Sequence, residues 1–147
     1  MTRAQRAAAC AYATIACLLA VGCSGSDMPL TKVAGRVTFN GSPPPRSGSV
    51  MFRLVKGTGA EGLPYRPGTA AFGTDGEFTA TSFKDGDGLL PGTYQVRVIC
   101  LSAPPAGVPL DSVSLVPLDW APEDLVVKGD EGEISVEYDI PPKKPKR

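Results

Sequence analysis

Four acidic side chains in or beside two glycine-containing turns are the first candidates for chemistry in this sequence. They are Asp75, Glu77, Asp85 and Asp87, and clustered carboxylate oxygens are the ligands that Ca²⁺ prefers. A complete calcium loop of the form Asp-x-Asp-x-Asp-Gly is absent, because the run 85–88 stops short and has no bidentate Glu at the right distance. Asp followed by Gly is also a common turn pair. We therefore expect turn residues here, with no metal and no cofactor.

Histidine is absent from the sequence, and its absence narrows the possible chemistry. Ser-His-Asp and Cys-His catalysis are excluded, and the commonest side-chain ligand of transition metals is missing. A hydrolase would need a carboxylate pair or a metal instead, and no such constellation stands out. The 15 Lys and Arg residues balance 15 Asp and Glu residues, which gives no electrostatic footprint for nucleic acid. We expect a protein that is not an enzyme and does not bind nucleic acid.

Three aromatic residues offer flat faces on which a sugar ring would stack: Trp120, Tyr65 and Tyr94. Tyr94 alternates with polar residues, which places it on the buried face of an expected strand. Trp120 lies near Pro117 and Pro122 in an expected connection, where it either contacts a ligand or closes one end of the domain. Trp120 and Tyr65 are therefore the candidate ligand contacts.

Residues 1–22 differ in composition from the rest of the chain. A polar start with Arg3 and Arg6 is followed by the apolar stretch 7–22, whose 16 residues include many Ala. A membrane-spanning helix needs about 20 apolar residues. A basic start, a short apolar stretch and small residues before the cut are typical of a secretory signal peptide. We expect residues 1–22 to be a cleaved signal peptide.

The end of this segment, Leu19-Ala20-Val21-Gly22-Cys23, resembles the bacterial lipobox, with Ala20 where that motif prefers Leu. The resemblance implies that Cys23 carries acyl chains and attaches the protein to a membrane. Residues 23–31 begin with a small, polar run and would form a flexible tether. The resulting expectation is a cell-envelope protein that is lipid-anchored and faces the periplasm or the exterior. A plain signal peptide with an incidental Cys is the alternative.

The remaining cysteines agree with this interpretation. Cys10 and Cys17 lie in the discarded segment, and Cys23 would carry lipid. Only Cys100 is left, so the mature chain cannot form an internal disulfide. Cys100 shares a strand face with Val98, which predicts core packing rather than a reactive thiol.

The 17 Gly and 15 Pro residues argue against a helical bundle, because both break helix interiors. Alternation of apolar and polar residues predicts short strands instead. We expect a loop over 102–117, with an optional edge segment at Val113–Val116, and no helix after residue 22. An Asp75-Gly76 hairpin is expected between the third and fourth strands. The seven expected strands are 32–40, 48–55, 69–74, 77–82, 93–101, 124–128 and 133–140.

Four motifs in order resemble carboxypeptidase regulatory-like (transthyretin-like) domains. Val33–Gly41 matches their opening V-x-G-x-V-T-x-x-G, Gly48–Phe52 matches the strand that follows, and Gly88–Val96 contains L-x-P-G-x-Y-x-V. Thr74–Phe78 matches T-D-x-G-x-F with one residue missing. The resemblance covers about residues 31–140 and implies a seven-stranded antiparallel β-sandwich with prealbumin-like topology. It also implies an accessory module without catalytic residues, as in small bacterial lipoproteins of this kind.

These observations lead to one expected function and one alternative. The first is a membrane-anchored, non-enzymatic lipoprotein, an accessory or interaction module whose partner is an envelope protein or polysaccharide. The alternative is a carbohydrate-binding β-sandwich. The domain is expected over 32–140, followed by a basic tail, 141–147, that either touches an anionic surface or is solvated. The positions expected to form the core are Val37, Phe52, Phe78, Tyr94, Val96 and Ile134.

Overall fold

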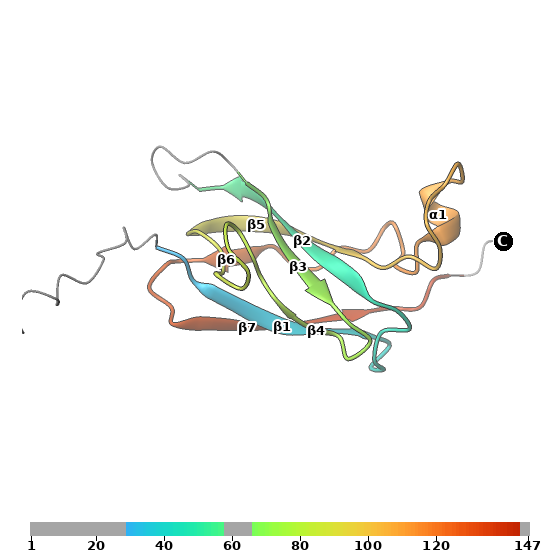
Figure 1. The fold of residues 1–147 in the computed structure, drawn as a ribbon, viewed down its shortest axis with the longest axis horizontal. Helices are drawn as coiled ribbons and strands as arrows, with labels where there is room; N and C mark the ends of the chain where they lie inside the picture. The colour runs from blue at the N-terminus through green and yellow to red at the C-terminus, as the bar shows by residue number, and fades with distance from the viewer. Residues whose placement is uncertain (1–28, 58–65, 145–147) are drawn as a thin grey trace, which may run out of the picture.

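Two β-sheets lie face to face in the computed structural model of the chain, which describes residues 29–57 and 66–144 (Figure 1). The first sheet has the strand order β4-β1-β7, and the second sheet has the order β3-β2-β5-β6. The expected all-β, two-sheet architecture is therefore confirmed. The strands are β1 Lys32–Phe39, β2 Gly48–Lys56, β3 Gly68–Phe72, β4 Glu77–Thr79, β5 Gly92–Ile99, β6 Leu125–Val127 and β7 Glu133–Ile140.

Alternation along β5 shows why these residues form strands with one buried face. Tyr94, Val96 and Val98 are buried, whereas Gln95 and Arg97 between them are exposed. Successive side chains of a strand point to opposite faces, so the apolar set packs against the facing sheet. The same alternation buries one face of β2 and β3.

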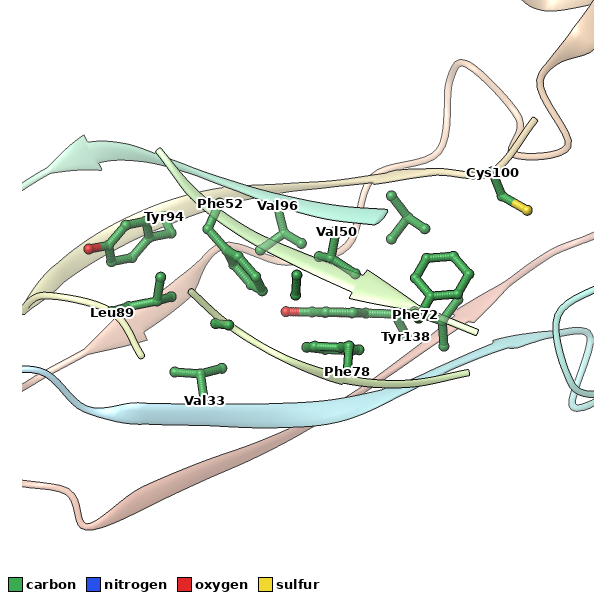
Figure 2. Close-up of a cluster of buried hydrophobic side chains, with 14 of the residues drawn as sticks. Val33, Val50, Phe52, Phe72, Phe78, Leu89, Tyr94, Val96, Cys100 and Tyr138 are labelled. Carbon is green, nitrogen blue, oxygen red and sulfur yellow. The ribbon is translucent and has the colours of Figure 1, made fainter. Parts of the chain in front are cut away.

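Aromatic side chains from both sheets meet at the centre of the core (Figure 2). The ring of Phe52 on β2 lies 6.3 Å from that of Phe78 on β4, and Phe78 stacks on Tyr138 of β7 at 5.9 Å. Of the six expected core positions, five are buried, and Ile134 is only half-buried. Ile134 is on β7, an edge strand of its sheet, so less protein covers it.

The expectation of a purely antiparallel sandwich is wrong at one pair of strands. β1 and β7 are parallel over their whole length, from the pair Lys32–Glu133 to the pair Phe39–Ile140. Parallel neighbours require a long crossover connection, and here nearly the whole domain lies between them. Alternation in sequence has the same period for either direction, so it could not reveal this pairing.

The expected hairpin around Asp75-Gly76 is also wrong. β3 and β4 belong to different sheets, and only an isolated bridge, Thr69 to Thr81, joins this part of the chain across the corner. β4 pairs instead with β1. The Asp75-Gly76 turn therefore carries the chain from one sheet to the other, with a positive φ at Gly76 alone (78°).

A short helix, α1 (Leu110–Val113), replaces part of the loop expected over 102–117. The optional strand at Val113–Val116 is reduced to one bridge, between Leu101 and Ser114. Pro109 precedes the helix, and its fixed φ (−57°) suits the entry to a helical turn. A single turn is too short to leave a period of 3.6 residues in the sequence, which is why no helix was expected.

The turn after β1 has the geometry that its Asn40-Gly41 sequence predicts. Both residues have positive φ, 52° and 74°, and Phe39 and Ser42 exchange backbone hydrogen bonds of 2.8 and 3.0 Å. These values describe a two-residue turn of type I′, which favours Asn-Gly. An Asp139 carboxylate oxygen on β7 accepts the Gly41 N–H at 2.8 Å, which holds the turn against the neighbouring strand.

Candidate functional site

A groove opens beside Trp120 and borders α1. Figure 1 shows that α1 lies at one end of the sandwich. It consists of two adjoining hollows that share Pro117, Leu118 and Trp120. The first hollow has a volume of about 580 Å³ and is also lined by Asp111 and residues 141–144. The second has a volume of about 360 Å³ and lies between the end of β5 and α1. We call the two hollows together the Trp120 groove.

Prolines explain why the chain bulges away from the sheet at this point. The Leu115 N–H still donates to Cys100 O at 2.8 Å, and pairing with β5 resumes at β6. Pro117 and Pro122 lie between these two points, and a proline has no N–H to give to a ladder. The backbone N–H of Trp120 donates to Pro117 O at 3.1 Å. This turn returns the half-buried indole to the edge of the core.

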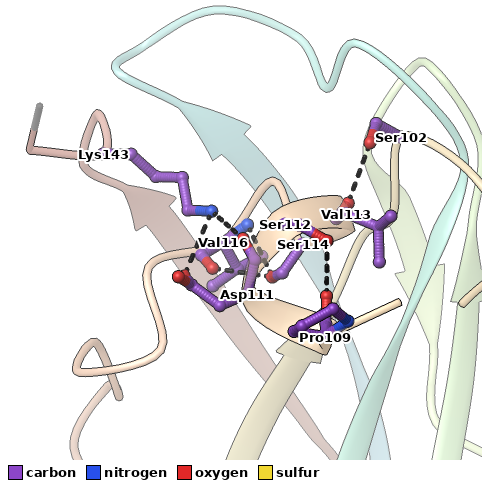
Figure 3. Close-up of polar contacts among 8 residues, drawn as sticks. All are labelled: Ser102, Pro109, Asp111, Ser112, Val113, Ser114, Val116 and Lys143. Atoms are coloured by element: carbon purple, nitrogen blue, oxygen red, sulfur yellow. Dashed lines mark hydrogen bonds and ion pairs between the residues drawn. The ribbon is translucent and has the colours of Figure 1, made fainter. Parts of the chain in front are cut away.

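Serine hydroxyls hold the α1 wall of the groove in place (Figure 3). Ser102 Oγ and the Ser102 N–H both donate to Val113 O, at 3.0 and 2.8 Å. Ser114 Oγ donates to Val116 O at 2.7 Å and is buried. The Ser102 bonds tie the end of α1 to the chain that follows β5, and the side chains of Val113 and Val116 in this wall are buried.

Lys143 attaches the chain after β7 to the same site. Its Nζ donates to the backbone O of Asp111 at 2.7 Å and lies 3.6 Å from Asp111 Oδ1 (Figure 3). Within the described part of the basic tail, Lys143 is thus bound to the domain, while Lys144 is exposed and lines the groove. The structure therefore brings together Trp120 and the start of the tail, two features that the sequence suggested separately.

The groove offers binding chemistry. It presents exposed apolar surface, including Leu118 with 60% of its area accessible, next to an indole face and prolyl rings. A lysine ammonium and the carboxylates of Asp111 and Asp119 lie on its polar side. Such a combination orients a ligand through a few polar contacts while the apolar walls exclude water.

The acidic turn residues make local contacts instead of converging. Asp87 accepts N–H bonds from Ser82, Phe83 and Lys84 at 2.8, 3.0 and 2.8 Å. Asp75 accepts the N–H of Glu77 at 3.2 Å. Across residues 29–57 and 66–144, no three Cys, Asp or Glu side chains gather where they would hold a metal ion.

Cys100 is fully buried, in the core position expected for it. Its Sγ lies 3.5 Å from Arg46 O. Burial raises the pKa of the thiol, although a backbone hydrogen bond and the positive charge of Arg46 oppose the shift. A thiol held in its neutral form is a poor nucleophile.

Tyr138 is a feature that sequence reasoning missed. Its alternation on β7 places the ring inside, but its hydroxyl is buried with no hydrogen-bond partner among the described residues. Burial raises the pKa of this phenol to about 12. No sequence signal could have revealed the orphan hydroxyl, because its burial depends on residues distant in sequence, such as Phe78 on β4.

Cys23 and Tyr65, the other two residues singled out from the sequence, lie outside the described residues. In the part of the chain that the structure does describe, no helix is long and apolar enough to cross a membrane. Comparison with protein-family models, with curated proteins and with solved structures found no match.

Proposed function

We propose that this chain is a lipid-anchored, non-enzymatic accessory or interaction module of the bacterial cell envelope. The observation that supports it most is the position of the Trp120 groove. The groove lies at the α1 end of the sandwich, whereas β1 begins at the opposite end (Figure 1). A tether before Lys32, attached to lipid at Cys23, would hold the domain by one end and leave the groove at the other.

The finer fold belongs to the same proposal. Two facing sheets with orders β4-β1-β7 and β3-β2-β5-β6 support a prealbumin-like sandwich of the carboxypeptidase regulatory-like kind. In that family the domain assists or connects other proteins. An exposed apolar groove with a cationic rim would serve the same purpose for a protein segment in the envelope.

The anchor is tested by Cys23→Ala in the full chain. We expect loss of metabolic acyl labelling and release from the membrane fraction. Unchanged labelling and membrane association would refute the anchor.

The groove is tested separately by placing a photo-crosslinking residue at Leu118, with a matched probe at the exposed Ser135 on β7. In intact cells we expect protein crosslinks from position 118 that disappear in Trp120→Ala. Equal crosslinking from both positions would count against a partner in the groove.

A carbohydrate ligand is the second candidate, favoured by one specific observation. Asp111 and Asp119 line the same hollow as Trp120, and an aromatic face beside polar groups suits a sugar ring. Retention on a polysaccharide column that is lost in Trp120→Ala but kept in Trp120→Phe would support this candidate over a protein partner.

A further inference from the structure

Charge is unequally divided between the two sheets. The strands of the second sheet, β3-β2-β5-β6, contain no acidic residue and three basic ones: Arg53, Lys56 and Arg97. All three side chains are exposed. The strands of the first sheet carry four acidic and two basic residues.

Within the described residues, none of the three cations of the second sheet forms an ion pair. The ion pairs among the described residues join Lys32 to Glu133, Arg36 to Glu77 and Lys143 to Asp111. None of them involves Arg53, Lys56 or Arg97. These three charges therefore remain available to an external anion.

Apolar side chains are exposed on the same strands. Met51, Val55 and Val126 have 37%, 48% and 53% of their areas accessible. Met51 is directly opposite Arg97, and Lys56 and Val126 flank Thr93 from the two sides. Cationic and apolar side chains are thus neighbours on one broad face, defined here as the outer face of the second sheet.

We propose that the outer face of the second sheet docks on the surface of an anionic lipid bilayer. Basic side chains are attracted to the negative potential of such a surface, and the neighbouring apolar side chains enter the boundary between headgroups and acyl chains. The strands of this face contribute no carboxylate that would repel the lipid. This combination matches a membrane surface better than a small ligand, because the three charges lie at three different cross-strand pairs of β2 and β5 instead of converging on one point.

The length of the tether permits this orientation, a step that rests on the proposed lipid at Cys23. Lys32 is nine residue steps after Cys23, and at about 3.3 Å per step this segment spans at most roughly 30 Å. Packed sheets are only about 10 Å apart. The anchored domain can therefore lie on the outer face of its second sheet. The hollow lined by Asp111 and residues 141–144 contains no residue of that sheet, whereas the hollow lined by Arg97 borders the docking face.

The experiment uses lipidated full-chain protein in vesicles of phosphatidylglycerol or of phosphatidylcholine. Acetylation of Lys56 and oxidation of Met51 are followed by mass spectrometry, with Lys32 on the first sheet as the internal control. We expect both second-sheet residues to react several-fold more slowly on phosphatidylglycerol only, and Lys32 to react equally on both. Equal rates for Lys56 and Met51 on the two lipids would overturn the proposal.

A charge-matched pair of variants sharpens the test. Arg53→Gln with Arg97→Gln removes two positive charges from the second sheet, and Lys32→Gln with Arg36→Gln removes two from the first. At about fivefold in affinity for each basic residue, docking should weaken roughly 25-fold in the first variant. Docking should change much less in the second variant, whose removed charges lie on the sheet that faces away from the bilayer. Equal weakening in both would show that only net charge matters and would overturn the proposal.

The experiment can separate a wrong lipid anchor at Cys23 from a wrong docking face on the second sheet. The same two double variants in a Cys23→Ala background share one N-terminal segment, so any difference in sedimentation with phosphatidylglycerol vesicles comes from the folded domain. No difference there would overturn the face proposal, even if Cys23 carries lipid. Protection of Lys56 that rises with protein concentration without vesicles would assign the face to a second copy of the chain, again overturning it.

Discussion

Two buried tyrosines, one from each sheet, differ in what their hydroxyl groups contact. Tyr94 on β5 donates its hydroxyl to Leu90 O at 2.8 Å. Tyr138 on β7 stacks on Phe78 but buries its hydroxyl without a partner among the described residues. A buried polar group without a hydrogen bond lowers stability, so the first sheet carries a defect at this point that the second sheet avoids.

On the outer faces the contrast is reversed: among the described residues, polar groups of the first sheet are paired, whereas cations of the second sheet are not. On the first sheet Arg36 bonds to Glu77 at 2.7 Å, and Thr38 donates to Asp139 at 2.8 Å. On the second sheet Arg53 and its basic neighbours have no ion-pair partner in the described structure. An exposed unpaired cation is solvated, so it costs little stability while staying available for binding. Unsatisfied groups thus affect folding in the first sheet, and in the second sheet they are the cations on which the proposed membrane docking rests.

The largest effect is expected where the two sheets meet. Phe52 is fully buried on the second sheet and lies against Phe78 of the first. Phe52→Ala should lower the free energy of unfolding by about 3–5 kcal/mol, because the change leaves a cavity. Urea denaturation measures the loss, with Met51→Ala, its exposed neighbour, as the control expected to change stability by less than about 0.5 kcal/mol. Similar losses in the two variants would contradict a core shared by both sheets.

The two tyrosines provide the next largest effect, with opposite signs. Tyr138→Phe removes an unpartnered hydroxyl and should raise the free energy of unfolding by about 1 kcal/mol. Tyr94→Phe leaves Leu90 O without its donor and should lower it by about 1 kcal/mol. Thermal denaturation of both variants tests the contrast. A stability change of the same sign in both variants would contradict it.

Alkaline pH provides a second measure of the Tyr138 hydroxyl. Its pKa is about 12 in the folded protein and 10 for the ordinary phenol. The folded state therefore holds this proton more tightly, and the stabilisation is fully present below pH 10 and lost as the pH rises toward 12. Denaturation between pH 9 and pH 12 should show a steeper loss in the wild type than in Tyr138→Phe. Parallel curves would mean that the phenol is not buried in solution.

A smaller effect is expected in acid, on the outer face of the first sheet. The Gly41 N–H, followed by the Thr38 hydroxyl, lowers the pKa of Asp139. Because this pKa is lowered, ionised Asp139 contributes to folding stability above the carboxyl's ordinary pKa. The contribution is lost as the pH falls through the pKa of the folded state. NMR titration should find the Asp139 carboxyl below its ordinary value in the wild type, and restored toward it in Thr38→Val. An Asp139 pKa that does not respond to Thr38→Val would rule out the hydroxyl as a cause.

The smallest effect concerns the exposed ion pairs of the first sheet. Both partners of the Arg36–Glu77 pair are more than half exposed, and pairs of this kind contribute about 0–1 kcal/mol. Glu77→Gln should therefore change the melting temperature only slightly, and high salt should reduce even that difference. A large destabilisation would show that this outer face contributes to folding far more than its exposure indicates.

Much of the local structure could be predicted because each signal lies within a few residues. Alternation from Tyr94 to Cys100 marks a strand with one buried face, and Asn40-Gly41 specifies a turn that needs two positive φ values. The pairing of β1 with β7 could not be predicted, since alternation records which face is buried and not which strand lies beside it. The same limit explains the mistaken hairpin at Asp75-Gly76.

The candidate site divides in the same way. The sequence by itself singled out Trp120 as an aromatic residue in a proline-rich connection, and it separated the basic tail from the domain. Only the tertiary structure placed Lys143 beside Asp111 and lined one groove with the tail and Trp120. The physical reason is that backbone propensities act over a few residues, whereas this groove depends on segments brought together by the packing of two sheets. The division of charge between the outer faces likewise exists only once strand order assigns each strand to its sheet.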